Sequence, residues 1–174
     1  ELLTVGNPAG QLALAQELGR LTSATPAEVV FQAALSAGNL PKPGALPFLA
    51  HFAAEKADQL LIREAIMSGL ENWELQFLQL LVTDPAWVEQ RPGRSSLLQT
   101  LANAIIKERE PTKISLLLTT IAAQRSQDVW RTHAMLDGIV AETQVRPIRP
   151  ISFASPPAAL DTLAKSDDAA VREQ

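Results

Sequence analysis

The sequence contains no cysteine and no tyrosine, and aromatic residues make up only 5% of its 174 residues. The absence of cysteine excludes disulfides, iron–sulfur clusters, cysteine-ligated zinc and thiol catalysis within this sequence. With so few aromatics, the hydrophobic 47% must be mostly Leu, Ala, Ile and Val. This composition is typical of helix-on-helix packing rather than of a β-sandwich, so we expect an all-α fold.

Long apolar runs are also lacking, since no run approaches the 18 residues or so of a membrane span. We therefore expect no membrane insertion by this part of the chain. The net charge is −4, which gives no general attraction to nucleic acid or anionic lipid. The charge is uneven, because residues 1–90 carry four Lys/Arg against ten Asp/Glu and residues 91–174 carry eleven against nine. We interpret this asymmetry as two differently charged ends of an elongated body, and expect no nucleic-acid partner.

Glycine is sparse but is placed in a pattern. Four of the eight glycines follow an alanine by four residues on segments that are predicted to be helical. Residues four apart share a helix face, so each pair makes a shallow strip that a neighbouring helix can approach closely. Four such strips indicate a helical unit that stacks against copies of itself. The pairs are Ala15/Gly19, Ala34/Gly38, Ala65/Gly69 and Ala134/Gly138.

Helix starts are marked by a capping residue followed by proline, as at Asp84-Pro85 and Glu110-Pro111. Apolar residues at helical spacing, such as Ile114, Leu117, Leu118 and Ile121, support the assignment. Short connections favour antiparallel hairpins. The fold class that we predict is an irregular α-solenoid, a HEAT-like superhelix of roughly eight or nine antiparallel helices. The predicted helices are 8–22, 26–38, 43–56, 58–71, 73–83, 95–109, 111–124, 128–142 and 156–165.

Two longer connections divide this pattern. Residues 86–94 contain a Pro-Gly pair at the change from acidic to basic composition, and we predict an internal joint there. In residues 144–155 the tripeptide Arg-Pro-Ile occurs twice from Arg146, which favours an extended polyproline II path. That segment either lies over neighbouring helices or is a motif for a proline-recognising domain. The predicted organisation is a helical-repeat domain at 1–143, a connector at 144–155 and a further, truncated repeat at 156–174.

Several segments resemble the second helix of a HEAT repeat, in which an Asp or Asn opening leads into an amphipathic helix with small residues. Asp58 to Gly69 and Asp128 to Gly138 have this form, and Asp167 to Arg172 keeps the Asp-x-x-x-Val-Arg opening. The order of segments over residues 7–140 resembles the HEAT region of large exported bacterial proteins similar to membrane-bound dehydrogenases. The segments that carry this likeness are Val30–Gly38, Leu60–Leu70, Arg94–Ala102 and Trp130–Gly138, with Phe31 standing where Arg is usual.

In that family a β-propeller similar to sugar dehydrogenases precedes the helices and a c-type cytochrome segment follows them. The resemblance implies a non-catalytic scaffold that contacts other proteins or neighbouring domains, with periplasmic or exported localisation. The sequence begins at Glu1 and stops within a helical pattern, so we expect a fragment of a larger protein. The alternatives are a free-standing adaptor that binds peptide or protein in a groove, a nucleic-acid-binding helical repeat, and an enzyme of unrecognised mechanism.

No group of residues in the sequence indicates catalysis. His51 and Glu55 lie four apart, but two ligands do not make a metal site. Ser95 with His133 as base lacks a nucleophile elbow and an oxyanion loop, and Ser95 is interpreted as a helix cap. Asp167-Asp168 lacks the pattern of a calcium loop and is interpreted as the cap of a helix. We predict no catalytic, cofactor-binding or metal-ligating residue.

The candidate interaction surface lies at the predicted joint. Trp87 stands beside the long connector, so it is the tryptophan that we expect to be exposed, whereas Trp73 and Trp130 are interpreted as core. Arg91 and Arg94 follow within seven residues. The predicted surface therefore consists of Trp87, Arg91 and Arg94.

Overall fold

A computed structural model describes residues 26–38, 40, 42–124, 128–145 and 150–173. Every regular element within these ranges is a helix, which confirms the all-α prediction. The chain divides into two compact units, unit 1 (residues 1–73) and unit 2 (residues 74–174). No helix among the described residues is long and apolar enough to cross a membrane. The predicted helix 8–22 and its strip Ala15/Gly19 lie outside the described residues.

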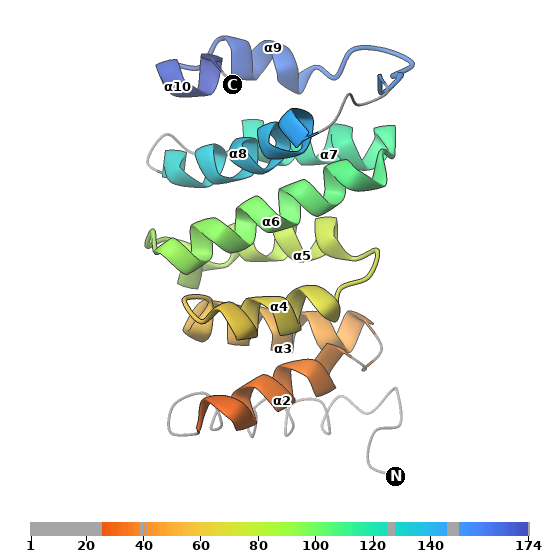
Figure 1. Ribbon diagram of the computed structural model, residues 1–174. Coiled ribbons are helices and arrows are strands. Elements are labelled where there is room, and N and C mark those ends of the chain that lie inside the picture. Colours follow the sequence, from red (N-terminus) through yellow and green to blue (C-terminus); the bar gives the residue numbers. More distant parts are fainter. Residues whose placement is uncertain (1–25, 39, 41, 125–127, 146–149, 174) are drawn as a thin grey trace. The chain divides into compact units, whose positions relative to one another are not determined.

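Unit 1 contains three described helices, α2 (Ala27–Gly38), α3 (Lys42–Lys56) and α4 (Leu60–Ser68) (Figure 1). Each packs against the other two. The core between them is mostly aliphatic, with the buried Phe48 and Phe52 from α3 as its aromatic side chains. Its fully buried side chains include Leu49, Phe52, Ile62 and Ile66.

Two of the predicted small-residue strips face each other in unit 1. Ala34 of α2 and Ala65 of α4 are buried, and so are Gly38 and Gly69 at the ends of the same two helices. A Cβ atom built on Gly38 would lie 2.6 Å from the Cα of Gly69. The strips therefore allow the backbones of α2 and α4 to come into direct contact.

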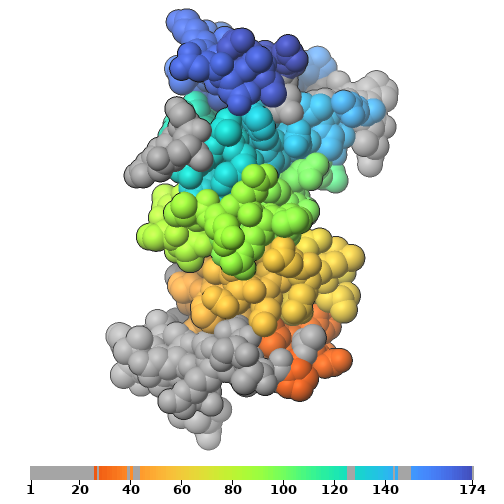
Figure 2. Space-filling view, turned by 90° about the vertical axis from the view of Figure 1, so that its left-hand side faces the viewer, coloured from red at the N-terminus to blue at the C-terminus, as the bar shows by residue number. Residues whose placement is uncertain are grey.

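Unit 2 is built around the long helices α6 (Pro92–Glu108) and α8 (Val129–Val145), which form its most extensive helix–helix contact. The third described strip lies in this contact, because a Cβ on Gly138 would clash with the carbonyl oxygen of Gln99. The C-terminal helices α9 (Ala159–Ala164) and α10 (Ala169–Glu173), blue in Figure 2, pack directly on α7 (Pro111–Ala122) and α8. The remaining described elements of unit 2 are α5 (Glu74–Thr83) and the 3₁₀ turn η1 (Pro85–Trp87).

Proline starts three of these elements, at Pro85 and Pro111 as the sequence predicts and at Pro92, which the sequence analysis places in a connector. Pro85, Pro92 and Pro111 each occupy the first turn, where a missing N–H costs nothing. Asp84 caps η1, since its carboxylate accepts a hydrogen bond from the backbone N–H of Ala86. The prediction that Ser95 caps α6 is wrong, because the proline starts that helix three residues earlier and leaves Ser95 inside it.

The predicted joint at 86–94 is also misplaced. The division between the two units falls at residues 73 and 74, and residues 86–94 belong to unit 2. At the C-terminal side, α8 continues to Val145 and helix resumes only at Ala159. Residues 146–149, most of the repeated Arg-Pro-Ile segment, lie outside the described residues. The described part that follows is non-helical, with Ile151 and Phe153 half-buried.

Candidate binding groove

The predicted surface of Trp87, Arg91 and Arg94 is largely interior. Trp87 is 0% exposed and Arg94 is 5% exposed. The guanidinium carbon of Arg94 lies 5.3 Å from the centre of the Trp87 ring, a cation–π contact, and its Nη1 donates to the carbonyl oxygen of Glu89. The expectation that Trp87 is exposed is therefore wrong: the turn that follows α5 folds the indole inward. Arg91 alone remains accessible, and it pairs with Glu89 at 2.8 Å.

The two histidines belong to different units. His51 and Glu55 are exposed on α3 of unit 1. His133 lies on α8 of unit 2, where its Nε2 is 3.3 Å from a carboxylate oxygen of Asp168, an ion pair when the imidazole is protonated. Among the described residues, no three His, Asp or Glu side chains come together in an arrangement that could hold a metal ion.

Asp168 caps α10, as the sequence predicts for the acidic pair. One of its carboxylate oxygens accepts a hydrogen bond from the backbone N–H of Val171. This bond, and secondarily the contact with His133, lowers the pKa of Asp168, because both stabilise the charged form. The cap lies beside an open pocket of about 470 Å³ that residues of α7, α8, α9 and α10 line.

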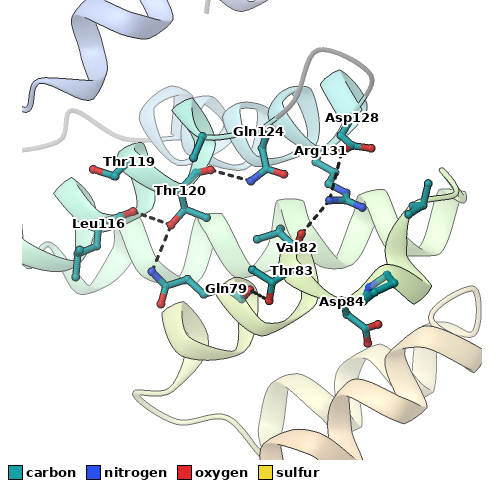
Figure 3. A pocket seen from close by; sticks show the side chains of 13 residues that line it. Gln79, Val82, Thr83, Asp84, Leu116, Thr119, Thr120, Gln124, Asp128 and Arg131 are labelled. Carbon is teal, nitrogen blue, oxygen red and sulfur yellow. Dashed lines mark hydrogen bonds and ion pairs between the residues drawn. The ribbon is translucent and has the colours of Figure 1, made fainter.

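A larger groove of about 670 Å³ opens in unit 2 between α5, α7 and the start of α8 (Figure 3). Its walls combine side chains that form hydrogen bonds with short apolar ones. It is lined by Gln79, Val82, Thr83, Asp84, Pro85, Val88, Leu116, Thr119, Thr120, Ala123, Gln124, Asp128 and Arg131.

Hydroxyl and amide groups link the α5 and α7 walls of the groove. The amide of Gln79 donates to the hydroxyl of Thr120 at 3.3 Å, and Gln124 donates to the Thr120 carbonyl at 2.8 Å (Figure 3). The hydroxyls of Thr83, Thr119 and Thr120 each donate to carbonyls one turn earlier on their own helices. A threonine hydroxyl has one hydrogen, so these three present lone pairs to the groove.

Arg131 is the buried charge at the end of the groove, with 5% of the residue exposed. Its Nη1 donates to the Val82 carbonyl at 2.9 Å and its Nη2 to the Trp87 carbonyl at 2.6 Å. Both carbonyls lie at the ends of short helices, where a cation is favoured by the helix dipole. Asp128 lies 3.8 Å from Nη1, and the guanidinium also covers the Trp130 ring at 5.6 Å. Arg131 therefore fixes α8 to α5 and η1.

Two of the large hydrophobic side chains that the described surface exposes lie on this groove. Val88, after η1, is 61% exposed, and Leu116 on α7 is 46% exposed. The sequence shows Asp128 and Arg131 as a polar pair on one helix, but their partners Val82 and Trp87 are more than forty residues away. For this reason no local sequence pattern indicates the groove.

Comparisons of the chain with protein-family models, with curated proteins and with solved structures give no match.

Proposed function

We propose that this chain is a non-catalytic interaction module of HEAT-like helical hairpins, and that the groove of unit 2 receives a segment of a protein partner. The support for this proposal is the composition of the groove. Accessible apolar side chains (Val88 and Leu116) stand on its rim, and groups that form hydrogen bonds line its floor. Sites that hold peptide segments combine these two kinds of surface, because apolar anchors supply affinity and polar groups fix orientation.

The HEAT-like part of the proposal is supported by where the resembling segments fall. Val30–Gly38 lies within α2, and Leu60–Leu70 covers α4 and the two residues after it. Arg94–Ala102 lies within α6, and Trp130–Gly138 lies within α8. In α2, α4 and α8 the glycine of the segment is packed against a neighbouring backbone. Close approach of consecutive hairpins is how helical-repeat proteins stack.

The same resemblance suggests the context in which the module works. We propose that it spaces or docks domains within a larger exported protein similar to a dehydrogenase–cytochrome, so that the segment in the groove comes from a neighbouring domain. The alternative is a free-standing adaptor whose groove takes a segment of a separate protein. Both use the groove in the same way, and they differ in whether module and segment belong to one polypeptide.

The test is selection of peptides from a random displayed library on the immobilised full chain. Ala123 is exposed at the end of α7 and lines the groove, so Ala123→Trp fills it with an indole. Ala164→Trp is the matched control, because Ala164 is exposed on α9 and lines neither cavity. We expect peptides that bind the wild type and the control but not Ala123→Trp. Peptides that bind all three proteins equally, or no enrichment at all, would contradict the proposed function.

A further inference from the structure

The described lining of the groove presents many more hydrogen-bond acceptors than donors. The hydroxyl hydrogens of Thr83, Thr119 and Thr120 are all directed to backbone carbonyls of their own helices. Each of these side chains therefore offers only lone pairs to a ligand. Gln79 and Gln124 each spend one amide N–H on Thr120, which leaves each with an oxygen and a second N–H. A ligand that matches this lining must bring donors.

The charges in the groove favour a cationic donor. Asp84 and Asp128 contribute two carboxylates, and Arg131 is the one cation in the described lining. The guanidinium offsets one of these two acids, because its Nη1 lies 3.8 Å from the carboxylate of Asp128, which is itself only 7% exposed. Asp84 is half-buried at the groove and is the acid that remains in excess. The accessible face of the groove therefore has an excess of negative charge.

Apolar contacts complete the description of the ligand. Val88 and Leu116 both line the groove and both keep about half or more of their surface exposed, at 61% and 46%. An apolar ligand side chain that covers them removes this surface from water, which is the main source of affinity in small interfaces. The backbone N–H groups of an extended peptide would supply further donors for the threonine oxygens.

We propose that the groove binds an extended peptide segment in which a Lys or Arg side chain, directed to Asp84, stands next to an apolar side chain that covers Val88 and Leu116. This inference rests on the proposed function and adds the chemistry of the partner. It assigns charge recognition to Asp84 and apolar recognition to the groove rim.

Asp84 gives the sharper test of the charge. Its carboxylate caps η1 through the Ala86 N–H, and asparagine is an equally good cap, so Asp84→Asn removes the charge and keeps the turn. Asp128 is less suitable, since it is 7% exposed and faces the buried Arg131. Asp161→Asn on α9 is the matched control, because Asp161 is exposed and lies outside the groove.

The experiment begins with the library peptides that Ala123→Trp no longer binds. Their composition is read first, and the Kd of one of them is then measured on the full chain with Asp84, with Asp84→Asn and with Asp161→Asn. We expect Lys or Arg beside Leu, Ile or Val in the selected peptides. We also expect about two- to fivefold weaker binding to Asp84→Asn, the size of an accessible ion pair, and no change with Asp161→Asn.

Two results overturn the inference, and they are distinguishable. Groove-dependent peptides without basic residues, or with unchanged affinity for Asp84→Asn, refute the assignment of a cationic partner and leave the proposed function standing. A library that gives no peptide sensitive to Ala123→Trp refutes the groove as a binding site, and the proposed function fails with it.

Discussion

Gly38 and Gly69 meet backbone to backbone where α2 and α4 pack together, so that a Cβ on either would lie 2.6–2.7 Å from the Cα of the other. Neither position requires glycine in order to adopt a left-handed backbone conformation. Gly69 ends α4 with φ −83° and ψ −8°, which any residue adopts. The requirement is for space alone, and it explains why an alanine stands one turn before each glycine on the same face.

Replacement of Gly69 by leucine should destabilise unit 1. The added side chain has no room beside Gly38 and Leu49, so we expect a loss of about 1–3 kcal/mol of unfolding free energy by overpacking. Gly138→Leu should do the same in unit 2, against Gln99 and Ala102. Urea or thermal unfolding measures both, with Ser68→Leu on exposed surface as the control. If the glycine variants melt with the wild type, the close packing of these strips is refuted.

Arg131→Met should destabilise unit 2 more than any exposed arginine variant. The change leaves two carbonyls and the carboxylate of Asp128 without their guanidinium partner in the interior. Loss of one partner from a buried charged cluster costs roughly 3–5 kcal/mol. Arg91→Met, which breaks an exposed pair with Glu89, should cost no more than about 1 kcal/mol. Equal denaturation midpoints for the two variants would contradict the role assigned to Arg131.

The fluorescence emission of Trp87 should indicate that water does not reach its indole ring. The difference between the emission spectra of the wild type and Trp87→Phe isolates the contribution of this indole, which is 0% exposed. We expect a blue-shifted difference spectrum that iodide quenches poorly, because neither water nor iodide reaches the ring. Strong quenching of that component would show that Trp87 belongs to the surface after all.

The carboxylate of Asp168 that caps α10 should stay charged at a lower pH than an ordinary aspartate. Because the hydrogen bond from Val171 lowers the pKa of Asp168 below its ordinary value of 3.8, the carboxylate stabilises the fold above pH 3.8. That contribution is lost as the pH falls through the lowered pKa. An NMR titration of the Asp168 carboxyl carbon should give a midpoint below 3.8, and the Val171 amide shift should follow it. A midpoint at or above 3.8 would refute the cap geometry.

Much of the fold follows from local patterns in the sequence. Proline at Pro111 and the apolar spacing from Ile114 to Ile121 locate α7 within two residues of its observed end. The small-residue strips predict close approach, and Gly38, Gly69 and Gly138 show it. The predictions that are wrong concern residues whose burial depends on contacts distant in sequence. Trp87 stands beside the predicted connector, but its burial is decided by the residues that pack around it.

The groove shows the same limit. Arg131 is visible in the sequence as a charged residue on a helix, and its function depends on the Val82 carbonyl, 49 residues earlier. Likewise Gln79 and Thr120 are joined across 41 residues. No helical periodicity relates such positions, so the sequence predicts the helices and not the surface that they make together.

The most direct test of the account uses the absence of cysteine, since an introduced thiol is the sole site for a dye. Val88→Cys places an environment-sensitive dye on the groove rim, and Leu160→Cys places it on exposed α9 outside the groove. The full chain carrying either dye is titrated with the library-selected peptide. The account predicts a saturable emission change from position 88 and none from position 160. A change at position 160 alone, or at neither position, would contradict it.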